Sequence, residues 1–317
     1  MEPEMPLPIE KIIADLSNLD KPVLNSKLVD LSDLNSEELG LLEKAWTTIE
    51  LKRRRRIMNR LVELAEDNPE LNFDVIFKSR LKDEDAGVRS KAMEGLWENE
   101  ESSMIDPLIK LLNEDSSAQV QEAAALALGK FTMLAAFGKL RSYHADKIAK
   151  NLFAVLEDKG KPIEIRRRAL EAVAPLDLVP VKEVIIEAYQ SDNPRLKTSA
   201  VYAMGKNCNL SWLPILLDEL NSVDSEMRYE AASACGELGE EEAVPHLIKL
   251  IGDSDIEVQL AAIQALGKIG GSKAKNCLKV CLNNPSKAIR QAAQQALNQL
   301  KIEEDPLSFK IWDANGE

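Results

Sequence analysis

The side chains that could hold a metal ion are few in this sequence and widely spaced. The two histidines are His144 and His246, and Cys277 and Cys281 lie four residues apart with no second pair or histidine nearby. Metal sites need more ligands than these positions supply together. We therefore expect these side chains to pack structurally, and we expect the protein to bind no metal and no cofactor.

No segment of the sequence has the spacing of a known catalytic motif. There is no GxSxG nucleophile turn, no Walker loop and no HExxH helix. Carboxylates are abundant, but no pair of them is singled out as a general acid and base. We therefore predict that the protein is not an enzyme.

The strongest charge cluster is a basic run in a chain whose formal net charge is −13. The run consists of Lys52, Arg53, Arg54, Arg55 and Arg56. Successive residues point all round a helix, so some of these must meet acidic neighbours. The run either pairs with acids of this chain or forms a basic spot for nucleic acid or an acidic partner. Because an acidic surface repels nucleic acid and anionic lipid, we expect neither a nucleic-acid nor a membrane partner.

A repeated helical phrase positions most of these residues. In each copy an apolar leader is followed four residues later by alanine, then by a small residue at offset +7 and an apolar residue at offset +8. The alanines, of which the last five are 31 residues apart, are Ala92, Ala124, Ala169, Ala200, Ala231, Ala262 and Ala293. These offsets share one helix face, and a fixed period of this length indicates a helical repeat array.

Polar and glycine residues mark the ends of the predicted helices. The N-cap candidates are Asp85, Ser117, Asn193, Asp224, Asp255 and Ser286. The glycines that either end helices or permit close helix contact are Gly205, Gly236 and Gly267, and Gly239 and Gly270 are further candidate stops. The arginines that follow the leaders should pair with acids of adjacent repeats; they are Arg89, Arg166, Arg228 and Arg290.

The phrases DIEVQLAAIQALG (255–267) and AVPHLIKLI (243–251) resemble bacterial HEAT repeats of the phycobilin-lyase-like type. The resemblance implies an all-α, right-handed superhelical α-solenoid of about seven to eight HEAT-like helical hairpins. Deoxyhypusine hydroxylases, a HEAT-repeat enzyme family, hold a di-iron centre through repeated His-Glu pairs. Neither His144 nor His246 is followed by Glu, so the resemblance implies no iron site here.

The pattern divides the chain into four segments. Residues 1–35 form an acidic, proline-containing arm with a short amphipathic helix, and residues 36–72 form a divergent helical cap. Residues 73–301 form the solenoid, with an extra helical insert near 131–149, where the repeat spacing is too long. Residues 302–317 form a tail whose Phe309, Ile311 and Trp312 either fold back or dock on a partner.

A candidate binding patch lies on the predicted concave face, which the second helices of HEAT hairpins usually line. Offsets +2 and +6 from the leaders should point into it, and at its centre they give Thr198, Tyr202, Tyr229, Leu260 and Gln264. A neutral, tyrosine-bearing centre with a polar rim is typical of a partner-binding surface. The alternative is that these side chains only cover neighbouring helices.

The sequence therefore predicts a non-catalytic protein-interaction scaffold, adaptor or assembly factor. We expect a monomer that binds an unidentified protein partner on the concave face. The start of the sequence has no signal-peptide pattern, which favours the cytoplasm. Two alternatives stay open: a chromophore- or cofactor-handling subunit, implied by the phycobilin-lyase-like resemblance, and nucleic-acid binding through residues 52–56.

Overall fold

The computed structural model describes residues 8–304, and every regular element in that range is helical. It contains eighteen α-helices and three short 3-10 helices. Over residues 8–304, no helix is long and apolar enough to cross a membrane. The predicted tail residues Phe309, Ile311 and Trp312 lie outside the described range. The helical architecture confirms the predicted all-α solenoid of helical hairpins.

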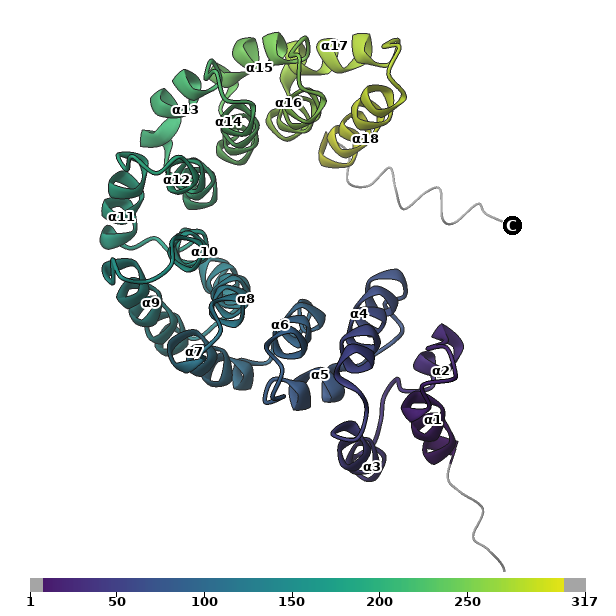
Figure 1. Ribbon diagram of the computed structural model, residues 1–317. Coiled ribbons are helices and arrows are strands. Elements are labelled where there is room, and N and C mark those ends of the chain that lie inside the picture. The colour runs from purple at the N-terminus through teal and green to yellow at the C-terminus, as the bar shows by residue number, and fades with distance from the viewer. Residues whose placement is uncertain (1–7, 305–317) are drawn as a thin grey trace, which may run out of the picture. The chain divides into compact units, whose positions relative to one another are not determined.

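The chain divides into two compact units, residues 1–172 and 173–317. In the first unit, the second helices α4, α6 and α8 pack side by side (Figure 1). Its helices are α1 (Pro8–Ser17), α2 (Asn25–Val29), α3 (Ser36–Trp46), α4 (Leu51–Asp67), α5 (Asp74–Arg80), α6 (Ala86–Gly95), α7 (Ile105–Glu114), α8 (Ala118–Ala136), α9 (Ser142–Glu157) and α10 (Ile163–Val173), whose last residue belongs to the second unit.

The second unit repeats the same arrangement more regularly. Its second helices α12, α14, α16 and α18 pack in a row, and each first helix packs on the second helix that follows it (Figure 1). Its helices are α11 (Val179–Tyr189), α12 (Pro194–Asn207), α13 (Leu213–Glu219), α14 (Ser225–Leu238), α15 (Val244–Leu250), α16 (Ile256–Ile269), α17 (Gly271–Cys281) and α18 (Lys287–Glu304).

The amphipathic stretch of the N-terminal arm forms α1 and packs within its own unit, against α3. Its apolar stripe, Ile9, Ile12, Ile13 and Leu16, is buried. The short helix α2 packs against α4 in the same way. Because burial of this stripe removes four large side chains from water, it adds to the stability of the unit.

Glycines after the repeated phrase allow the second helices to approach closely. A Cβ atom on Gly205 would lie 2.8 Å from Ala234, and one on Gly236 would lie 2.8 Å from Ala265. One on Gly267 would lie 2.8 Å from the Cβ of Ala296. Of the two alternatives for these glycines, close helix contact is therefore the correct one. Helix α14 ends instead at Gly239, whose backbone adopts the left-handed conformation with φ 76°.

Four of the predicted N-caps accept a hydrogen bond from the first turn of their helix. They are Asp85, Asn193, Asp224 and Asp255. The side chain of Ser117 makes no such bond; instead, the carboxylate of Asp115 accepts from the Ser117 N–H at 2.9 Å. The same bond to the N–H of the N-cap residue precedes α6 and α16, so it accompanies a side-chain cap in those helices and occurs without one in α8.

The irregular spacing between Ala124 and Ala169 corresponds to two long helices. Helix α8 has 19 residues and α9 has 16, and residues 137–141 connect them. No separate helix lies in this connection. The residues beyond the 31-residue period therefore lengthen α8, the second helix of one hairpin, and α9, the first helix of the next.

Candidate functional site

Two tyrosines are exposed on neighbouring second helices of the second unit. Tyr202 on α12 is 36% exposed and Tyr229 on α14 is 37% exposed. On α16, Leu260 is half-buried and Gln264 is exposed. Because α12 packs on α14 and α14 on α16, these residues lie on three adjacent helices, at offsets +2 and +6 of the repeat. We call Tyr202, Tyr229, Leu260 and Gln264 the tyrosine patch.

Thr198 does not belong to the exposed part of this surface. It is buried at 4% exposure, and its hydroxyl donates to the Pro194 carbonyl oxygen at 3.0 Å within α12. The expectation that it faces a partner is corrected, because the hydroxyl bonds back one turn and the short side chain stays among the helices.

A row of alternating charges lies C-terminal to the patch on the same three helices. Glu237 Oε1 is 2.9 Å from Lys206 Nζ and 3.0 Å from Lys268 Nζ. Burial alone would raise the pKa of Glu237, but hydrogen bonds from the two ammonium groups bring the pKa below its usual value. The Lys206 ammonium also lies 5.5 Å from the Tyr202 ring centroid. This row holds α12, α14 and α16 in register beside the tyrosines.

Three arginines of the basic run are engaged by their own unit. Arg53 donates to the carbonyl oxygens of Leu16 and Asp15 at the end of α1, and its side chain is buried. Arg54 is buried as well and contacts two acids of the next hairpin, Asp83 at 3.3 Å and Glu84.

Arg55 makes a two-point contact with Asp85, at 2.8 and 2.7 Å. Lys52 and Arg56 have exposed side chains. Most of the cationic run therefore joins α4 to α1 and to the α5–α6 turn. Lys52, Arg55 and Arg56 are exposed, but the charge of Arg55 is paired with Asp85, so the run offers a small footprint for a phosphate backbone.

The arginines after the leaders link hairpins in two of the four predicted cases. Arg89 contacts Asp115 with two hydrogen bonds of 2.8 Å, and Arg228 contacts Asp253 in the same way. Arg290 donates instead to backbone carbonyls at 2.7 Å. Within the described range, Arg166 Nε is buried without a hydrogen-bond partner.

The first unit contains a groove that the sequence analysis did not single out. It has a volume of about 400 Å³, within the range of ligand-sized sites. It lies between α6 and α8 and is lined by Met93, Trp97, Met104, Leu126 and Phe131 among others. Trp97 is 54% exposed and Leu126 is 57% exposed. Trp97 follows the end of α6, where helical periodicity gives no signal for its direction.

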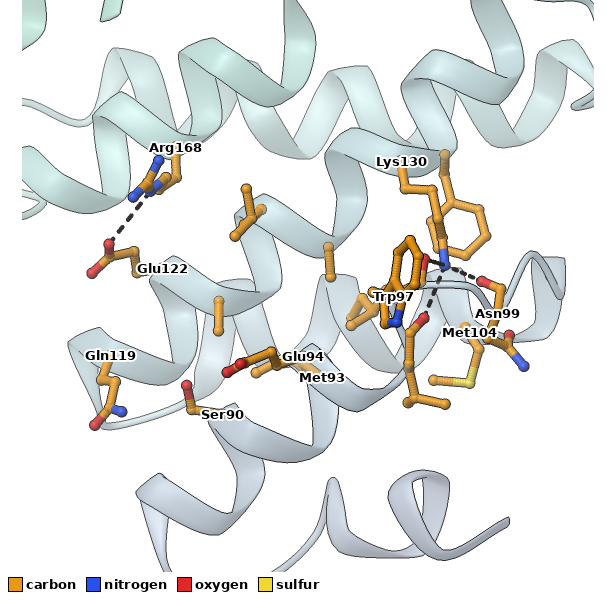
Figure 2. A pocket seen from close by; sticks show the side chains of 16 residues that line it. Ser90, Met93, Glu94, Trp97, Asn99, Met104, Gln119, Glu122, Lys130 and Arg168 are labelled. Carbon is orange, nitrogen blue, oxygen red and sulfur yellow. Dashed lines mark hydrogen bonds and ion pairs between the residues drawn. The ribbon is translucent and has the colours of Figure 1, made fainter. Parts of the chain in front are cut away.

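Charged side chains close both ends of the groove (Figure 2). At one end Arg168 lies 3.5 Å from Glu122 and 2.8 Å from Glu171. At the other end the Lys130 ammonium donates to the carbonyl oxygens of Leu96 at 3.0 Å, Trp97 at 3.1 Å, and Asn99. Burial lowers the pKa of Lys130 below its usual value.

Cys277 and Cys281 are in contact with each other, but no third candidate metal ligand joins them in the described residues. Across residues 8–304, no group of three or more His, Cys, Asp or Glu side chains could hold a metal ion. His246 is half-buried. Burial raises the pKa of Cys281 to about 11, which favours the neutral thiol over a metal-binding thiolate.

Comparison with known proteins places these features in context. The sequence family of HEAT repeats matches residues 74–147 and 213–298. Deoxyhypusine hydroxylase of Bos taurus is 33% identical over 89 residues, which is 27% of this chain and 29% of the bovine protein. The similarity therefore spans less than a third of that relative.

The structure is similar to solved structures at low sequence identity. The complex of CpcE and CpcF of phycocyanin lyase from Nostoc is 16% identical, with a TM-score of 0.51 over 95% of this chain and 97% of that chain. Human deoxyhypusine hydroxylase is also 16% identical, with a TM-score of 0.37 over 92% of this chain and 96% of that chain. At such identity the likeness to the lyase complex concerns the fold and not the activity.

Proposed function

We propose that this chain, which belongs to the HEAT-repeat family, is a non-catalytic scaffold, adaptor or assembly factor that binds a protein partner through the tyrosine patch. The observation that carries the proposal is the pair of partly exposed tyrosines, Tyr202 and Tyr229, on adjacent helices at repeat offsets one helical turn apart, +6 and +2. Tyrosine combines a large apolar ring with a polar hydroxyl, and it is enriched among residues that dominate binding energy.

The helices beneath the patch supply a rigid platform. The close approach of Gly205 to Ala234 and of Gly236 to Ala265 fixes the spacing of α12, α14 and α16. The Lys206–Glu237–Lys268 row fixes their register. A surface that is ordered before binding loses little conformational entropy when the partner arrives, so two aromatic anchors contribute more of their contact energy to affinity.

The test is affinity purification from native lysate with quantitative mass spectrometry, followed by titration of the recovered partner. The variant is Tyr202→Ala with Tyr229→Ala. The matched control is Tyr143→Ala, which removes a tyrosine that is 67% exposed on α9 of the other unit. We expect the double variant to weaken binding at least about tenfold, because two interface anchors together contribute more than about 1.4 kcal/mol.

Circular dichroism of the double variant provides the folding control. Both tyrosines are partly exposed, so their removal should leave the helical signal and the melting temperature close to those of the wild type. A correctly folded double variant that retains full affinity for the partner contradicts the proposal.

A second candidate function is the handling of a bilin chromophore, and it rests on the fold shared with the phycocyanin lyase complex. Titration of the purified protein with a linear tetrapyrrole distinguishes the two candidates. Saturable binding with a shifted visible absorbance would favour the chromophore function over the scaffold.

A further inference from the structure

The turn after α6 presents a tryptophan among glutamates. Residues 94–101 read Glu-Gly-Leu-Trp-Glu-Asn-Glu-Glu, and the four exposed glutamates are Glu94, Glu98, Glu100 and Glu101. Trp97 lies between these glutamates in the sequence, and 54% of its surface is exposed. In the described part of the chain, neither Glu98 nor Glu100 forms an ion pair, whereas Glu94 pairs with Lys91 and Glu101 with Lys78. We call residues 94–101 the acidic lip.

Beside the acidic lip lies the apolar floor of the α6–α8 groove. Met93, Met104 and Phe131 are buried beneath it, and Leu126 stands at its edge. The flexible, polarisable thioethers of methionine adapt to varied apolar side chains. The floor therefore accepts aliphatic groups without demanding one particular shape.

The acidic lip is held in place before any ligand binds. The Lys130 ammonium ties together the carbonyl oxygens of Leu96, Trp97 and Asn99 (Figure 2). The Asn99 side-chain amide donates to Asp74 at 2.5 Å, and its oxygen accepts from the Glu101 N–H at 3.1 Å. These bonds fix the backbone on both sides of Trp97, at the edge of the groove.

We propose that this groove is a docking site for a basic, apolar segment of a partner protein. An aliphatic side chain of the segment enters the floor between Met93 and Leu126. A neighbouring Lys or Arg lies over the indole of Trp97, where the glutamates of the acidic lip complement its charge. An aromatic face among four glutamates, of which Glu98 and Glu100 form no ion pair in the described part of the chain, suits a cation and disfavours an acidic ligand; the nearby Lys130 ammonium offsets only part of their charge.

This docking site is separate from the tyrosine patch. The groove is formed by residues of the first unit, whereas Tyr202 and Tyr229 belong to the second. The two proposals are therefore tested by different substitutions, and each can fail while the other holds.

The experiment is selection of a phage-displayed random dodecapeptide library on the full-length protein. The strongest peptides are then synthesised with a fluorescent label and titrated by fluorescence anisotropy. We expect the selected sequences to combine Lys or Arg with Leu, Ile, Met or an aromatic residue. We expect Trp97→Ala to weaken their binding at least tenfold.

Further variants separate the charge contribution from the apolar one. Glu98→Gln with Glu100→Gln should weaken binding severalfold in low salt and have less effect at high ionic strength, because salt screens exposed charges. Leu126→Lys should abolish binding, since it places a cation at the edge of the floor. Tyr143→Ala and the double variant of Tyr202 and Tyr229 serve as controls and should bind like the wild type.

Three outcomes would overturn the proposal. One is a library that yields no enriched sequence, and another is enrichment of acidic or neutral peptides. The third is equal affinity for the wild type and for both the Trp97→Ala and Leu126→Lys variants. Loss of binding only in the double tyrosine variant would place the peptides on the tyrosine patch instead.

Discussion

Asp253 is the residue through which α14 and the following hairpin are linked. Its carboxylate accepts two hydrogen bonds of 2.8 Å from Arg228 and caps its own turn through the Asp255 N–H at 2.9 Å. The hydrogen bond from Arg228 lowers the pKa of Asp253 in the folded protein. The contribution of this contact to stability is therefore fully present above the usual pKa of aspartate and is lost as the pH falls through the folded value.

Asp253→Asn should consequently destabilise the protein at pH 7 by about 1–3 kcal/mol, since Arg228 loses a charged partner. The difference from the wild type should shrink as the pH is lowered below the usual aspartate pKa. Thermal unfolding followed by circular dichroism from pH 7 to pH 3 measures both effects. Asp192→Asn, at an exposed turn position of the same unit, is the control. A pH-independent difference would contradict this account.

At the residue scale, the sequence predicted contacts that repeat and missed those that do not. The acidic partners of Arg89 and Arg228 were expected, because arginine recurs after the leader of several repeats. The prediction that Thr198 is exposed was wrong, because the repeat offsets do not reveal that its hydroxyl bonds to the preceding helical turn. Trp97 was overlooked because it follows the last residue of α6, where the helical period ends.

At the element scale, the fit between second helices depends on Gly236. A Cβ atom there would lie 2.8 Å from the Cα and 2.9 Å from the Cβ of Ala265 on α16. Alanine is a better helix former than glycine by up to about 1 kcal/mol. The clash involves backbone that cannot rotate away, and overpacking of this kind costs about 1–3 kcal/mol.

Gly236→Ala should therefore lower the free energy of unfolding by up to about 2 kcal/mol, as measured by urea denaturation. Gly40→Ala is the matched control, because Gly40 also lies inside a helix and a Cβ there meets nothing within 4 Å. The control should be unchanged or more stable. Equal effects of the two substitutions would show that the close approach of α14 and α16 does not restrict the size of the side chain at position 236.

Helix positions and ends were largely predictable from local chemistry. Asp85, Asn193, Asp224 and Asp255 cap the helices that the repeat spacing placed there. The sequence showed that the spacing before Ala169 exceeds the period, but it did not show how the additional residues are divided between helices. Both a separate helix and two longer ones satisfy the helix-forming composition of residues 131–149, and only the packing of α8 on α7 and α9 distinguishes them.

At the scale of the whole molecule, the 31-residue period was sufficient to predict the fold class. Every repeat buries the same face, so Ala200, Ala231 and Ala262 are fully buried on successive helices. The proposed binding surfaces follow no such rule. A solenoid is compatible with many exposed side chains at offsets +2 and +6, so the fold alone does not determine which residues stand there.

The similarity to bovine deoxyhypusine hydroxylase over 89 residues raises the question of whether this chain binds iron. The whole sequence offers two histidines, and His144 and His246 are followed by Ala145 and Leu247. Iron sites built from nitrogen and oxygen donors need several such ligands converging on one point. We expect protein incubated anaerobically with Fe(II) and then desalted to retain less than stoichiometric iron by plasma mass spectrometry. One or two iron atoms held per chain, and lost in His144→Ala or His246→Ala, would instead point to a metalloprotein and away from a scaffold.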